Sequence, residues 1–254
     1  VLGSGQLEHL YYGRKLHANE AVMTEKHTFI PGNTNVYNKD YSSYSLEDVC
    51  LEMSSLGKGD IREPFIEVTY PNGSSTTDMV FDRAEIIQGK EEYDTLPGSY
   101  DDNGEVEQLV IYLKDRNYNL TLELHYYVYE KCDIITRSAK LVNSGNESVR
   151  LERLMSMQLD LNESDYELSF FNGAWAREMN RSRISLRAGK YVNESVTGTS
   201  SNRANPFFMI GRSSTTEDYG ECYGFNLIYS GNHYEAAQVN SYGKLRLVSG
   251  INPA

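Results

Sequence analysis

The sequence contains few cysteines for its length of 254 residues. The three that occur, Cys50, Cys132 and Cys222, lie far apart and form no Cys-x-x-Cys motif. An odd, scattered set of this kind is a poor framework for disulfides and a poor zinc site. We therefore expect reduced, buried thiols in a cytoplasmic protein, with no metal ion or other cofactor bound.

Positive charge is also scarce, because 24 Lys and Arg face 36 Asp and Glu, which gives a formal net charge of -12. Binding to nucleic acid needs clustered cations that neutralise phosphates, so this balance argues against a nucleic-acid partner. No apolar run approaches the roughly 18 residues that cross a bilayer. We accordingly expect no contact with nucleic acid and none with a membrane.

The common catalytic motifs are missing as well. The five histidines show no metal-binding spacing, and no glycine-rich phosphate loop is present. Acidic residues are adjacent at Asp101–Asp102, Glu91–Glu92 and Glu217–Asp218. Adjacent side chains point to opposite faces of a strand, and in turns they usually face water. We therefore assign no catalytic residue to this chain.

A two-residue alternation of apolar and polar side chains dominates the sequence. It is clearest in residues 118–129, where it places Leu120, Leu122, Leu124, Tyr126 and Val128 on one face of a strand. The same alternation predicts strands over residues 106–113, 134–142, 149–161 and 245–251. Turn-forming residues 143–147 separate two of these strands and predict a hairpin.

Only one segment has a helical pattern. Ser45 could cap a helix over residues 46–53, with Val49, Cys50 and Met53 on one face. Residues 24–43 are polar and predict a long surface loop. So many alternating segments predict an all-β fold, a large antiparallel β-sandwich of two extended sheets with at most one or two short helices.

The only tryptophan, Trp175, stands beside a glycine and directly before Ala176, Arg177 and Glu178. An indole can stack on the apolar face of a sugar ring while charged neighbours bind the hydroxyls. The same residues would also suit a core tryptophan beside a surface ion pair. Residue types alone leave both interpretations open.

The segment Phe171-Asn172-Gly173-Ala174-Trp175-Ala176-Arg177-Glu178 resembles one in bacterial α-galactosidases of glycoside hydrolase family 36. Other short segments match the family in the same order along essentially the whole chain. These are residues 4–13 (SGQLEHLYYG), 133–138 (DIITRS), 165–168 (DYEL), 205–207 (NPF), 220–225 (GECYGF), 229–232 (YSGN) and 250–253 (GINP).

The resemblance implies that residues 1–254 form a single N-terminal domain of the galactose-mutarotase-like supersandwich type, with a catalytic (β/α)₈ barrel expected downstream. Family members are retaining hydrolases of terminal α-linked galactose, as in melibiose and raffinose, and form homo-oligomers, tetramers in the family. Their two catalytic aspartates lie on barrel motifs that do not occur in this chain. The implied partners are α-galactosides, reached through the complete enzyme, and the barrel itself.

The resemblance also implies roles for individual residues. Trp175 would line the galactose pocket, and Arg177 and Glu178 would either contact the sugar or form an ion pair that holds the tryptophan loop. Some relatives use an acidic residue of an N-terminal loop, where this chain has Lys26 with Glu25 beside it. Residues 200–205 are interpreted as a loop that leads into a strand at Phe207.

Two other functions remain open from the sequence. Tryptophan and tyrosine on a β-sandwich also suit a self-standing carbohydrate-binding module. The third alternative is a purely structural or oligomerisation domain with no ligand of its own.

Overall fold

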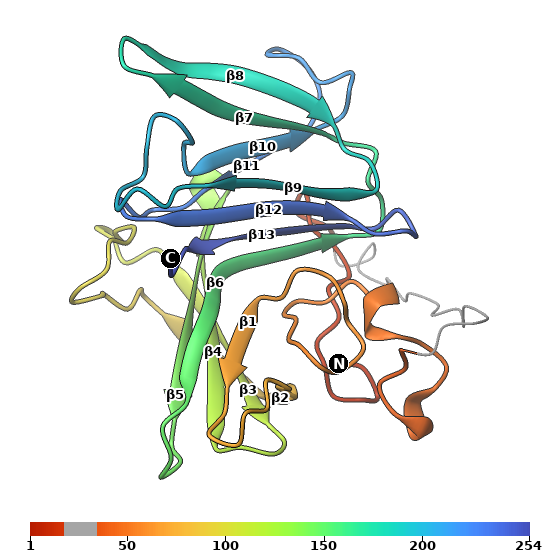
Figure 1. Ribbon diagram of the computed structural model, residues 1–254. Helices are drawn as coiled ribbons and strands as arrows, with labels where there is room; N and C mark the ends of the chain where they lie inside the picture. The colour runs from red at the N-terminus through yellow and green to blue at the C-terminus, as the bar shows by residue number, and fades with distance from the viewer. Residues whose placement is uncertain (18–34) are drawn as a thin grey trace.

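Thirteen strands in three antiparallel sheets build the described part of the chain, residues 1–17 and 35–254 of a computed structural model (Figure 1). A five-stranded sheet has the order β1-β6-β13-β12-β9, and two four-stranded sheets have the orders β11-β10-β7-β8 and β2-β3-β4-β5. The strands are β1 Ile66–Thr69, β2 Met79–Gln88, β3 Glu107–Asp115, β4 Leu120–Tyr129, β5 Ile134–Asn143, β6 Arg150–Leu161, β7 Glu167–Ala174, β8 Arg177–Ser185, β9 Gly189–Glu194, β10 Phe207–Gly211, β11 Cys222–Asn226, β12 His233–Val239 and β13 Leu245–Ile251.

The helical content of the described residues is limited to three single turns of 3-10 helix, η1 Lys39–Tyr41, η2 Leu46–Asp48 and η3 Glu130–Cys132. None of these turns is long or apolar enough to cross a membrane. The predicted all-β antiparallel fold and the five predicted strands are confirmed, each strand within two residues of its predicted ends. The strands are distributed over three sheets, however, and not over the two that we expected.

The third sheet arises because the five-stranded sheet buries both of its faces. On β12, Ala236 packs into a core shared with β4, whereas its neighbour Ala237 packs into a second core shared with β7 and β10. On β13, Val248 and Leu247 divide between the two cores in the same way. Alternate side chains of one strand therefore serve two cores. In Figure 1 the sheet of β7, β8, β10 and β11 lies above the five-stranded sheet, and the sheet of β2–β5 lies below it.

The five residues predicted to share one face of β4 do so, but the core does not cover that face along its whole length. Leu120, Leu122 and Leu124 are buried as expected, but Val128 is 40% exposed. On the opposite face Tyr127 is buried, because a loop crosses the outer side of the sheet and its Tyr93 hydroxyl lies 2.9 Å from that of Tyr127. The core therefore covers one face of β4 along the first half of the strand, and the loop covers the opposite face farther along.

The hairpin expected at residues 143–147 is wrong. The turn exists, but β5 pairs with β4 while β6 pairs with β1 and β13. The two strands belong to different sheets, since β6 is needed to extend the five-stranded sheet. A turn signal specifies a local reversal of the chain and leaves the pairing partner open.

The helix expected over residues 46–53 is reduced to the single turn η2. Ser45 caps it as predicted by accepting the Glu47 N–H, but Val49 already has extended backbone angles. The Leu51 N–H donates to the Asp160 carboxylate at 2.9 Å, a partner more than a hundred residues away. Long-range bonds therefore outweigh the local helical pattern. The loop expected over residues 24–43 is described only from residue 35 onward.

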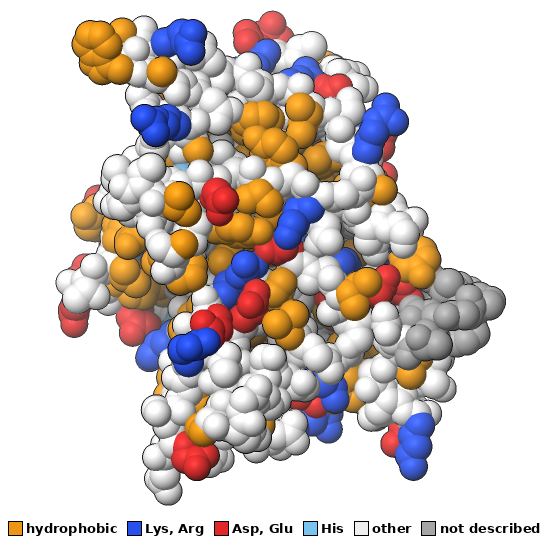
Figure 2. Space-filling view, in the orientation of Figure 1, with side chains coloured by type: hydrophobic (Ala, Val, Ile, Leu, Met, Phe, Trp, Pro, Cys, Tyr) orange, Lys and Arg blue, Asp and Glu red, His pale blue; other side chains and the backbone are white. Residues whose placement is uncertain are grey.

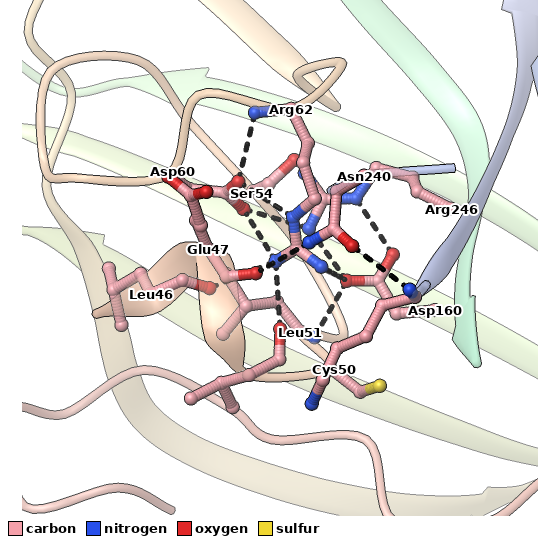
Figure 3. Close-up of polar contacts among 12 residues, drawn as sticks. Leu46, Glu47, Cys50, Leu51, Ser54, Asp60, Arg62, Asp160, Asn240 and Arg246 are labelled. Carbon is pink, nitrogen blue, oxygen red and sulfur yellow. Dashed lines mark hydrogen bonds and ion pairs between the residues drawn. The ribbon is translucent and has the colours of Figure 1, made fainter. Parts of the chain in front are cut away.

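A buried ionic cluster fastens this N-terminal segment to the five-stranded sheet (Figure 3). The Arg246 guanidinium contacts Asp60 at 2.8 Å and Asp160 at 2.6 Å, and Arg62 contacts the same two carboxylates at 2.9 and 3.2 Å. All four side chains are almost fully buried. Burial favours the neutral acid, but Arg246 and Arg62 outweigh it and lower the pKa of Asp60 below its usual range.

The expectation of buried cysteines is correct for one of the three. Cys50 is buried, whereas Cys132 follows β4 on the surface and Cys222 begins β11 at the exposed edge of its sheet. All three are free thiols.

Candidate functional site

Trp175 lies at the tip of the β7–β8 hairpin, which projects from the top of the molecule at the upper left of Figure 1. Ala174 pairs with Arg177, so Trp175 and Ala176 form a two-residue connection. The indole is 90% exposed. The same corner of Figure 2 shows a hydrophobic side chain close to Lys or Arg side chains. The interpretation of Trp175 as a core residue is therefore wrong. Its indole is accessible, as the interpretation as a sugar-stacking residue requires.

The backbone of the hairpin tip is strained. Ala176 and Met179 adopt left-handed conformations, with φ of 59° and 55°. Such angles cost residues other than glycine roughly 1–2 kcal/mol. Gly173 is required for a different reason, because a Cβ atom there would lie 2.6 Å from the Arg177 carbonyl oxygen. Backbone strain of this kind often occurs at functional sites.

The structure brings Arg177 and Glu178 to the hairpin but does not join them. Both are exposed, and among the described residues no ion pair connects them. The Glu178 carboxylate instead accepts the Ala176 N–H at 2.8 Å, which stabilises the strained turn. The expected ion pair between Arg177 and Glu178 is therefore absent from the described part of the chain, and Glu178 instead holds the tryptophan loop by a hydrogen bond from the backbone. Glu25 and Lys26 lie outside the described residues.

A loop over residues 200–205 supports the base of the hairpin. The Asn205 backbone N–H and side-chain amide both donate to the Phe171 carbonyl of β7, at 3.1 and 3.0 Å. Asn172 in turn donates to the Arg203 carbonyl at 2.7 Å. The loop enters β10 at Phe207, as predicted from the sequence. The Trp175 hairpin therefore depends on a second segment for its position.

Beneath this loop lies a buried polar pair that the sequence did not reveal. The Asn193 amide nitrogen lies 2.7 Å from both the Asn205 carbonyl and the Glu235 carboxylate. The second Glu235 oxygen and both ring nitrogens of His233 have no hydrogen-bond partner within residues 1–17 and 35–254. Burial raises the pKa of Glu235 to about 8 and lowers that of His233. The signal in the sequence was a polar side chain on a core-facing position of β12, beside Ala237 and Val239.

The adjacent acid pairs lie in loops between the strands. Asp102, Glu92 and Asp218 are exposed, and the Asp101 carboxylate accepts the Glu105 N–H at 2.9 Å within a turn. In the described ranges, no group of three or more His, Cys, Asp or Glu side chains could hold a metal ion.

The exposure of the single tryptophan gives a direct optical test. We expect the fluorescence of the chain to match that of free tryptophan in its emission maximum and in its quenching by acrylamide, because the indole is 90% exposed. The control is Trp175→Phe, which should lose this emission with little change in stability. A blue-shifted emission that resists quenching would contradict the exposed position.

Fold and hairpin together define a large antiparallel β domain that carries one aromatic side chain on a strained, projecting turn. The family model described as "Glycosyl hydrolase family 36 N-terminal domain" matches residues 5–254. The chain belongs to this family.

Curated relatives agree with this assignment. The chain is 36% identical to the α-galactosidase AgaA of Geobacillus stearothermophilus over 98% of its own length and 34% of that protein. It is 34% identical to the bifunctional α-galactosidase/sucrose kinase AgaSK of Mediterraneibacter gnavus, over 98% of its length and 26% of the relative. The chain thus spans about a third or less of the curated relatives that it matches.

Solved structures show the same relationship. The crystal structure of the family 36 α-galactosidase AgaA has a TM-score of 0.95 at 33% identity and covers 100% of this chain, which spans 35% of that structure. The α-galactosidase of Lactobacillus brevis has a TM-score of 0.94 at 35% identity, with 99% and 34% covered. A variant of AgaA was solved in complex with stachyose.

Proposed function

We propose that this chain is the non-catalytic N-terminal domain of a longer α-galactosidase, in which it supports a catalytic barrel and supplies Trp175 as one wall of the galactose pocket. The observation that carries the proposal is the 90% exposed indole on a strained turn in a domain of family 36. Relatives of this family include enzymes solved with stachyose and with raffinose. These sugars define the substrate class that we propose.

The chemistry of the hairpin fits binding better than bond cleavage. An indole offers a flat apolar face to the C–H groups of a pyranose, and the adjacent Arg177 guanidinium can donate to hydroxyls. Retaining hydrolysis requires two facing carboxylates about 5–5.5 Å apart. Glu178, the acid of the hairpin, is used by the backbone of the turn. The reacting carboxylates would therefore come from the barrel of the longer protein.

Exposed apolar side chains support the further proposal that this domain docks against the barrel or a second copy of the enzyme. Val128 and Ile135 are register partners on β4 and β5 and are 40% and 49% exposed. Apolar side chains that gather on one part of a surface are typical of interaction sites.

The proposal predicts different results for the chain and for the longer protein. This chain should not hydrolyse p-nitrophenyl-α-galactoside above a contaminant control, because it supplies binding groups only. In a protein that joins the chain to its barrel, Trp175→Ala should raise KM about tenfold with little change in kcat, as for the loss of about 1–2 kcal/mol of stacking that the ground and transition states share.

The control is Tyr100→Ala, which removes another aromatic side chain, 79% exposed, from a loop outside the hairpin. Equal effects of the two variants, or turnover by the chain alone, would refute the proposal. Calorimetric titration of the chain with melibiose separates the alternatives: saturation that depends on Trp175 favours a self-standing binding module, and its absence favours a domain that binds at this position only beside a barrel.

A further inference from the structure

A polar groove lies on the outer face of the sheet β2-β3-β4-β5, opposite the side that faces the core. It has a volume of about 540 Å³, within the range of small-molecule sites. Its floor is formed by strands β3, β4 and β5, and residues 88–91 at the end of β2 form a wall. The Trp175 hairpin belongs to a different sheet, so the groove is a separate feature.

Two buried polar side chains organise the floor. Gln108 of β3 is 4% exposed and His125 of β4 is 5% exposed. The Gln108 amide nitrogen lies 2.8 Å from His125 Nδ1, and because an amide nitrogen can only donate, Nδ1 must accept. The proton of the neutral ring is therefore on Nε2, which faces the Glu123 carboxylate at 3.3 Å. These bonds hold the floor in one arrangement.

The charged groups of the groove are balanced. Lys90 and Lys140 bring two ammonium groups, and Glu91 and Glu123 bring two carboxylates. Lys140 lies 3.4 Å from Glu123, which leaves both groups with unused hydrogen-bonding positions, since an ammonium has three donors and a carboxylate about four acceptor sites. The groove thus offers both donors and acceptors, and the charges of its Lys and Glu residues cancel.

We propose that this groove is a second binding site, for a neutral oligosaccharide of two or three sugar units. A ligand with many hydroxyls can donate to the carboxylates and accept from the ammonium groups at the same time. An anion would meet Glu91 and Glu123, a cation would meet Lys90 and Lys140, and an apolar ligand would leave all four charges desolvated. The site goes beyond the proposed function, which places the sugar contact at Trp175.

The test is a titration of the chain with raffinose, followed by ¹H–¹⁵N NMR. We expect saturable shifts of the signals of Lys90, Gln108 and His125. The double variant E123A/K140A removes one carboxylate and one ammonium without altering net charge, and it should weaken binding at least tenfold. The matched control D82A/K114A removes an ion pair of the same sheet that lies outside the groove and is 3.0 Å long, and it should bind like the parent.

Trp175→Ala separates this site from the hairpin and should leave the groove titration unchanged. If E123A/K140A does not give a folded spectrum, Lys90→Ala in the wall serves in its place, with the same expected loss. The proposal is overturned if raffinose produces no saturable shift, if only Trp175→Ala abolishes binding, or if glucose 6-phosphate binds more tightly than raffinose.

Discussion

Replacing Arg246 with leucine should lower the free energy of unfolding by about 3–5 kcal/mol, the usual cost of removing one partner of a buried ion pair. Arg246 is fully buried and contacts both Asp60 and Asp160. Without it, two buried carboxylates face a single remaining cation, Arg62. Both acids would then be held in a place where burial favours their neutral form. The measurement is urea denaturation at pH 7.

The appropriate control is an ion pair on the surface of the chain, where both side chains are exposed to solvent. Lys131 and Glu105 have exposed side chains, and Lys131→Gln should change the stability little. An Arg246→Leu variant as stable as the Lys131→Gln variant would show that the cluster in Figure 3 contributes nothing to the fold. Because the cluster joins residues 60–62 to β6 and β13, we also expect the N-terminal segment to become the first region cleaved by protease.

Glu235→Gln should make the chain more stable at pH 9 and leave its stability at pH 4 almost unchanged. Burial raises the pKa of Glu235 to about 8 in the folded chain, above its ordinary value of 4.5. The unfolded chain loses its proton first, so the contribution of Glu235 to stability is present below about pH 4.5 and is lost as the pH rises toward 8. Glutamine keeps the shape and never ionises, and the gain at pH 9 should be about 3–5 kcal/mol.

Glu52→Gln is the informative comparison, because the pKa of Glu52 is shifted in the opposite direction and the variant should lose stability where Glu235→Gln gains it. Burial disfavours the charged form of Glu52 too, but Arg137 and His9 outweigh it and lower the pKa of this carboxyl. Its charge therefore stabilises the fold at neutral pH, and the glutamine variant should be less stable there. Unfolding midpoints measured from pH 4 to 9 test both variants. A Glu235→Gln variant whose advantage does not grow with pH would contradict the raised pKa.

The sequence predicted those features of the fold that repeat every two residues. Residues 245–251 form β13 with the predicted bounds, although this strand is paired on both sides and buried on both faces, which alternation alone does not indicate. The helix expected over residues 46–53 does not form, because the Leu51 N–H bonds to Asp160, a residue too distant in sequence to be identified from local patterns. Alternation also could not reveal that β5 and β6 belong to different sheets.

The candidate site was predictable in part for a similar reason. The residue type and neighbours of Trp175 marked the hairpin, but its exposure and the left-handed backbone of Ala176 follow from the turn geometry. Glu235 was missed because a single acid in a strand of alternating residues resembles an exposed position. Only the pairing of β12 with β9 and β13 places it in the interior.

The shared strands of the five-stranded sheet restrict how this domain can change in length. Inserting one residue into β12 would rotate Ala236 and Ala237 into each other's cores and misplace side chains in both at once. Engineered insertions should therefore be tolerated in the connections of the two outer sheets and rejected within β12 and β13. The middle layer is the invariant part around which longer or shorter versions of this domain can be built.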